Sequence, residues 1–173
     1  AVKKLTSKFR AGYFDYDENR NFGILTKDNE LYRFSFAPDN RLTFRKIETG
    51  VKFNFIDRPS ISPSGDVVLF SARTENNYEI YRFDLRDSTL TLENGVNGKY
   101  TKWAYENSYI FVGTADGSDG VYHYDIVTKR SVRMTTYNSG FIYDIFTADD
   151  RVLISYYNNS GAVVCQDYLV NSG

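Results

Sequence analysis

Tyr81-Arg82-Phe83-Asp84 returns later in the chain as Tyr122-His123-Tyr124-Asp125 and again as Val164-Cys165-Gln166-Asp167, and this repetition indicates the architecture. The three aspartates stand 41 and 42 residues apart. An earlier copy, Tyr32-Arg33-Phe34-Ser35, lacks the aspartate. A fixed period of this length is the sequence signature of a repeat architecture.

Each copy follows a turn-rich cluster and a second apolar segment, as Ser62-Pro63-Ser64-Gly65-Asp66 and Val67 to Phe70 do in the best-preserved repeat. The stretch from Glu79 to Leu85 alternates polar and apolar residues, as a half-buried strand does. No window shows sustained helical spacing. The repeat is therefore predicted to be a meander of about four short strands.

Four such units account for most of the 173 residues. The predicted fold class is all-β, a small β-propeller of about four four-stranded blades in a single domain, 1–173. The predicted blades are 11–50, 58–95, 100–137, and 141–173 together with 2–6. The segment Val2-Lys3-Lys4-Leu5-Thr6 is expected to close the ring by completing the last blade, which removes an open sheet edge. An alternative is that the chain forms half of an eight-bladed dimer.

The second unit resembles the TolB-type propeller repeat. Its Ser62-Pro63-Ser64-Gly65 turn, its apolar strand and its Ile80-Tyr81-Arg82-Phe83-Asp84 strand match the family pattern, which usually has Asp where this chain has Ser64. The other units retain little beyond the aromatic-x-x-Asp end. The resemblance implies a propeller of a kind widespread in extracytoplasmic bacterial proteins, mostly as binding or scaffold modules and sometimes as accessory domains of hydrolases.

Composition removes several classes of function. The formal net charge of −1 gives no electrostatic bias toward nucleic acid or an anionic membrane. No apolar run exceeds four residues, against the ~20 that span a bilayer, so no membrane insertion is expected. One Cys and one His exclude an intrachain disulfide and a zinc site built mainly from those residues. We expect no metal and no cofactor, and we expect an extracytoplasmic location.

The chain carries no recognisable catalytic motif. His123 lies in the middle of a predicted strand without an identifiable acidic or nucleophilic partner. The expectation is therefore a protein that is not an enzyme. The alternative is an enzyme in which two Asp or Glu side chains in the central channel act as general acid and base. The sequence leaves this alternative open, because Asp and Glu occur in nearly every loop.

The connections between blades share a pattern that the fold does not obviously require. An aromatic residue recurs there, in most cases after a lysine. The candidate ligand-binding residues are Lys8, Phe9, Arg10, Lys52, Phe53, Lys99, Tyr100 and Phe141. Rings beside cationic groups on one face would suit an acidic protein segment or a glycan. The alternative is that the rings pack between sheets and leave only the lysines exposed.

These observations predict a non-catalytic binding or scaffold module that recognises a protein segment or a glycan through the loop face around the channel. One alternative is a carbohydrate-active enzyme that uses channel carboxylates. Another is a structural subunit that forms a homo-oligomer by exchanging a terminal strand.

Overall fold

The computed structural model describes residues 11–75, 77–115, 117–135, 142–148, 151–158 and 160–170. Within these ranges every regular element is a β-strand, and all pairings are antiparallel. No helix among them has the length and hydrophobicity to cross a bilayer. The all-β prediction is therefore confirmed.

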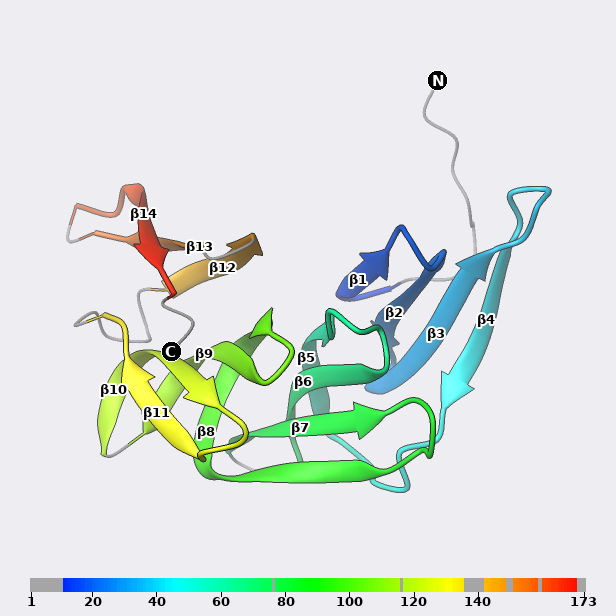
Figure 1. Cartoon of the computed structure of the whole chain (residues 1–173), viewed down its shortest axis with the longest axis horizontal. Coiled ribbons are helices and arrows are strands. Elements are labelled where there is room, and N and C mark those ends of the chain that lie inside the picture. Colours follow the sequence, from blue (N-terminus) through cyan, green and yellow to red (C-terminus); the bar gives the residue numbers. More distant parts are fainter. Residues whose placement is uncertain are drawn as a thin grey trace.

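Three sheets follow one another along an open arc (Figure 1). The first sheet contains β1 (Phe14–Asp17), β2 (Phe22–Lys27), β3 (Glu30–Phe36) and β4 (Leu42–Ile47). The second contains β5 (Phe55–Ile61), β6 (Val67–Arg73), β7 (Tyr78–Asp84), β8 (Leu90–Tyr105), β9 (Ser108–Ala115), β10 (Ser118–Asp125) and β11 (Arg130–Arg133). The third contains β12 (Ile142–Ala148), β13 (Arg151–Tyr157) and β14 (Val163–Leu169). Strands that are neighbours in sequence are neighbours in each sheet.

The long strand β8 joins two predicted blades into one sheet. Its first part pairs with β7 from Leu90 to Leu92, its second part pairs with β9 from Gly98 to Tyr105, and Asn97 is paired with both neighbours. The predicted blades 58–95 and 100–137 are therefore hydrogen-bonded to each other in one sheet, and their bounds stay a prediction. Gly98 lets the backbones of β8 and β9 approach closely, because a Cβ at this position would lie 2.6 Å from the Val112 carbonyl oxygen.

We call the four groups of strands meanders 1 to 4. Meander 1 is β1–β4, meander 2 is β5–β7 with the first part of β8, meander 3 is the second part of β8 with β9–β11, and meander 4 is β12–β14. Among the described residues the strands form no closed ring, and Figure 1 shows β1 and β14 at opposite ends of the arc. Residues 2–6, predicted to complete the last blade, lie outside the described residues, so closure and blade number stay predictions.

Two of the three repeated aspartates, Asp84 and Asp125, cap the turns that follow the third strands of meanders 2 and 3, whereas Asp167 lies within β14 and pairs with Arg151. The Asp84 carboxylate accepts a hydrogen bond of 2.8 Å from the Arg86 backbone, and the Asp125 carboxylate accepts one of 2.7 Å from the Thr128 backbone. The hydrogen bonds and charge of Arg86 lower the pKa of Asp84 to about 2. Turn geometry thus explains the aspartate at these two positions.

The core lies between consecutive meanders and has three parts. Between meanders 1 and 2 it contains Phe22, Ile24, Leu31, Ile47, Phe53, Ile56, Val68, Phe70, Ala72, Tyr81 and Phe83. Between meanders 2 and 3 it contains Leu69, Ile80, Val96, Trp103, Tyr109, Phe111, Ala115, Tyr122 and Tyr124. Between meanders 3 and 4 it contains Ile110, Val112, Val121, Ile145, Val152, Ile154, Tyr156 and Val170. Each inner meander is therefore covered on both faces.

Candidate functional site

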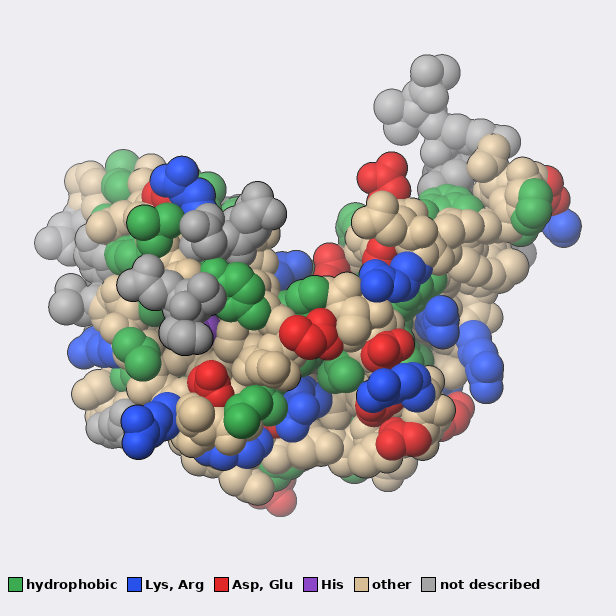
Figure 2. Space-filling view, viewed as in Figure 1, with side chains coloured by type: hydrophobic (Ala, Val, Ile, Leu, Met, Phe, Trp, Pro, Cys, Tyr) green, Lys and Arg blue, Asp and Glu red, His purple; other side chains and the backbone are tan. Residues whose placement is uncertain are grey.

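The first strands of the four meanders surround a central channel. A cavity of about 320 Å³ is lined by residues from all four of them, including Asp15 of β1, Ile61 of β5, Lys102 of β8 and Phe146 of β12. Figure 2 shows a hollow between the two ends of the arc, with charged atoms of both signs at its floor. The channel is therefore a mixed polar and apolar surface.

Asp15 holds three of these strands together within the channel. Its Oδ2 accepts a hydrogen bond of 2.8 Å from the backbone of Ile61, and its Oδ1 lies 3.7 Å from the Lys102 Nζ. The Asp15 carboxylate is thus occupied by a backbone amide and a lysine.

A second group of side chains lies where the connections enter the first strands. We call it the channel cluster, and it consists of Tyr13, Asp57, Arg58, Tyr100 and Asp144. The Arg58 guanidinium carbon lies 4.2 Å from the centroid of the Tyr100 ring and 5.4 Å from that of Tyr13. Arg58 also forms an ion pair with Asp144, and its Nε lies 3.8 Å from the Asp57 Oδ1. Cation–π contacts and ion pairs thus converge on one arginine.

Irregular backbone brings the channel cluster together. The strand register shifts between Asp57 and Ser60 in β5, between Lys99 and Lys102 in β8, and between Ile142 and Asp144 in β12. A bulge redirects a side chain relative to a regular strand. Tyr100 has a φ of 56°, which is uncommon for a bulky residue. Three neighbouring strands are therefore interrupted at the same end of the channel.

Burial changes the acid–base properties of this cluster. Asp57 is 3% exposed, and burial raises the pKa of its carboxyl group, with the charge of Arg58 acting in the opposite direction. Burial, followed by the charge of Asp57, raises the pKa of the Tyr100 hydroxyl. Tyr100 therefore remains a neutral phenol whose hydroxyl can donate a hydrogen bond to a ligand.

The structure divides the predicted ligand-binding residues into three groups. Lys8, Phe9, Arg10 and Phe141 lie outside the described residues. Lys99 and Tyr100 adjoin the channel, with the Lys99 Nζ 4.9 Å from the centroid of the Tyr100 ring. Lys52 and Phe53 line a different pocket, described next. Ligand binding by any of them stays a prediction.

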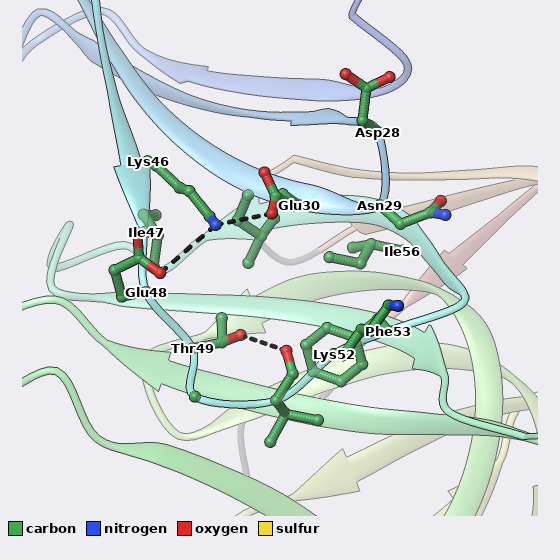
Figure 3. A pocket seen from close by; sticks show the side chains of 13 residues that line it. Asp28, Asn29, Glu30, Lys46, Ile47, Glu48, Thr49, Lys52, Phe53 and Ile56 are labelled. Carbon is green, nitrogen blue, oxygen red and sulfur yellow. Dashed lines mark hydrogen bonds and ion pairs between the residues drawn. The ribbon is translucent and has the colours of Figure 1, made fainter.

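The pocket beside Lys52 lies between meander 1 and the connection to meander 2 and has a volume of about 320 Å³ (Figure 3). Lys52 is exposed at this pocket, whereas Phe53 is 4% exposed and packs edge-on against Phe70, 5.6 Å away between ring centroids. Lys52 and Phe53 thus follow the alternative stated above, in which the ring packs between sheets and only the lysine is exposed. The Lys46 Nζ lies 2.7 Å from Glu30, so the pocket's own charges are largely paired.

Sequence reasoning missed Arg58, Asp57, Asp144 and Tyr13. Pro59 was an available signal, because proline within a strand indicates an edge or a bulge and β5 has both. The ion pair between Arg58 and Asp144 joins residues 86 positions apart, and no local pattern reports such a contact.

Comparison with solved structures identifies the fold. The chain is similar to TolB from Acinetobacter baumannii, with 18% identity and a TM-score of 0.72 over 98% of this chain and 43% of that one. It is similar to a putative TolB from Agrobacterium tumefaciens, with 19% identity and a TM-score of 0.76 over 93% and 58% of the two chains. Virginiamycin B lyase from Staphylococcus aureus matches at 10% identity and a TM-score of 0.55, over 94% and 56%.

No family model matches the chain, and no curated protein matches it either. The chain spans 43% and 58% of the lengths of the two TolB structures. At this level of identity the likeness shows the fold alone, which is that of a TolB-like β-propeller.

Proposed function

Starting from a TolB-like β-propeller fold, we propose that this protein is a non-catalytic binding module that recognises an acidic protein segment through the channel cluster and Lys99. The observation that carries the proposal is the position of Arg58 between two tyrosine rings and two aspartates, at the end of the channel where three inner strands are interrupted. Strain and irregular backbone that persist in a fold are commonly associated with binding sites.

The charges favour an anionic ligand. Arg58 is shared between Asp57 and Asp144, whereas no carboxylate within ion-pair distance of Lys99 is found in the described part of the chain. A carboxylate of a bound segment could therefore pair with Lys99 and accept a hydrogen bond from the Tyr100 hydroxyl. Tyr13 is 38% exposed and would offer an apolar ring to the same segment.

A fluorescence-anisotropy titration tests this proposal with two labelled twelve-residue peptides, one rich in Asp and Glu and the other rich in Lys and Arg. The acidic peptide should bind more tightly, and its affinity should decrease at high ionic strength. Tyr100→Asn removes the ring while retaining a residue that tolerates positive φ. Together with Lys99→Gln, it should weaken binding at least about tenfold, which corresponds to ~1.4 kcal/mol.

Arg130→Gln is the matched control, because Arg130 is an exposed cation on β11 away from the channel. Equal loss of affinity in the control would mean that general charge attraction explains binding. If neither peptide binds, a xylan or chitin hexasaccharide is tested next. Binding of the hexasaccharide that Tyr100→Asn abolishes would show that the ligand is a glycan and not a protein segment.

The enzyme alternative makes a different prediction at the same place. Asp57 and Asp144 both lie beside Arg58, and glycoside hydrolysis uses a pair of carboxyl groups about 5 to 10 Å apart. Turnover of the hexasaccharide that is lost in both Asp57→Asn and Asp144→Asn would favour that alternative over a binding module. An extracytoplasmic location is part of the proposal and is supported by the fold resemblance.

A further inference from the structure

Two arginines face each other across neighbouring strands of meander 1. Arg33 of β3 and Arg45 of β4 are directly opposed in the strand register, so their side chains extend from the same face of the sheet. Both are exposed, and no carboxylate lies within ion-pair distance of either one among the residues that the structure describes. Like charges that are directly opposed destabilise a strand pair. The stability of the sheet therefore does not explain this pair of cations.

The other two arginines of meander 1 differ from this pair because each has an acidic partner nearby in the chain. The Arg20 Nη1 lies 2.6 Å from the Asp17 Oδ2, and Arg41 forms an ion pair with Asp39. The positive charge that is left without such a partner in this meander is therefore concentrated where the side chains of β3 and β4 lie next to each other.

A buried ring positions one of the two cations. The Arg33 guanidinium carbon lies 4.3 Å from the centroid of the Phe22 ring. Phe22 is 3% exposed and belongs to the core between meanders 1 and 2, so the ring is held in place. A guanidinium group that lies over a ring keeps the N–H groups at its edge available as hydrogen-bond donors. Arg33 is therefore held in place for an anion without its donors being used.

Both arginines line an open cavity of about 510 Å³ on meander 1. None of the described residues that line this cavity is Asp or Glu. The hydroxyl groups of Ser35 and Thr43 occupy the next row on the same face of the sheet, and their oxygens lie 2.8 Å apart. The described lining thus combines two free guanidinium groups with two hydroxyl groups.

We propose that Arg33 and Arg45 bind the phosphate or sulfate ester group of a small ligand in this cavity. The N–H fork of a guanidinium group matches two oxygens of a tetrahedral oxyanion, and two such forks on one face can hold one anion between them. The bound anion also compensates the repulsion between the two arginines. The Ser35 and Thr43 hydroxyls supply further donors to the ester oxygens. The site shares no residue with the channel cluster.

Isothermal titration calorimetry of the full chain in a phosphate-free buffer of low ionic strength tests the proposal. The probes are glucose 6-phosphate, glucose 6-sulfate and glucose. At least one ester should bind with a dissociation constant below about 1 mM, and glucose should not bind. The ester that binds more tightly identifies the ligand group. Arg33→Gln combined with Arg45→Gln should raise that dissociation constant at least about tenfold.

Two controls separate this site from other cations. Arg130→Gln removes an exposed arginine of β11 and should leave the affinity for the ester unchanged. Lys99→Gln combined with Tyr100→Asn alters the proposed segment-binding site and should also leave it unchanged, so each proposal can fail independently. Unchanged melting temperatures would show that the variants remain folded. Binding of neither ester, an affinity insensitive to the loss of Arg33 and Arg45, or an equal loss in Arg130→Gln would overturn the proposal.

Discussion

The middle of the molecule and its β12–β14 end are built from the same alternating strands, yet they differ in what covers them. In β6 and β9 almost every side chain is buried, whereas β14 is exposed at most positions. The middle strands lie between two neighbouring meanders, and β14 has a neighbour on one face only among the described residues. Burial in this fold is therefore decided by position along the arc more than by the strand sequence itself.

The largest loss of stability is expected when a buried aromatic side chain is removed from the middle sheet. Phe111 is fully buried and stacks on Tyr122. Phe111→Ala should lower the free energy of unfolding by about 3–5 kcal/mol, because it removes buried surface and leaves a cavity. Urea denaturation followed by the fluorescence of the single Trp measures this change. A loss below about 1 kcal/mol would mean that the middle sheet is packed no better than the end.

The same comparison applies to ion pairs. Glu93 is buried and pairs with Arg82 and with Lys129, whose Nζ lies 3.3 Å away. Glu93→Ala should cost about 2 kcal/mol, because it leaves the half-buried Arg82 without its partner. Asp167→Ala breaks the exposed pair with Arg151 on meander 4 and should cost below about 1 kcal/mol. Equal losses of unfolding free energy for Glu93→Ala and Asp167→Ala, measured by urea denaturation, would contradict this difference between buried and exposed ion pairs.

Asp57 makes the middle sheet sensitive to pH in one direction. Because burial raises its pKa above 3.8, the folded protein holds this proton more tightly than the unfolded chain does. This stabilisation is fully present below the unfolded pKa and is lost as the pH rises through the folded pKa. The free energy of unfolding of the wild type should therefore fall, relative to Asp57→Asn, as the pH rises above 3.8.

The control for that experiment is Asp84→Asn, since Arg86 lowers the pKa of Asp84 to about 2. Its contribution has the opposite sign, because the stability from Asp84 is present above the unfolded pKa and is lost as the pH falls toward 2. If both variants shifted the pH profile in the same direction, the assignment for Asp57 would be wrong.

The smallest effect is expected at the end of the arc. Leu169 is 66% exposed on β14. Leu169→Ala should change the free energy of unfolding by at most about 0.5 kcal/mol, because the side chain is already largely in solvent. A loss of about 2 kcal/mol or more in urea denaturation would contradict this exposure.

The sequence predicted the strands and the turns because those depend on local chemistry. The repeat of Asp84 and Asp125 follows from the turns that these residues cap. The fusion of two predicted blades through β8 was not predictable in the same way, because it depends on how closely Gly98 approaches β9 across the sheet.

The candidate site shows a similar division. Lys99 and Tyr100 were identified from the repeated connections, but the side chains beside them were not. Arg58 comes from another strand, and Asp144 from a third. Their meeting depends on register shifts in each strand, and alternation of polar and apolar residues carries no information about such shifts.

The shared strand β8 has a consequence for how the molecule comes apart. Since one continuous strand supplies the partner of β7 in meander 2 and of β9 in meander 3, we expect the two meanders to open together. Slow amide exchange should therefore disappear from both at one common opening free energy, as in a single foldon, while β12–β14 exchanges earlier in a separate step.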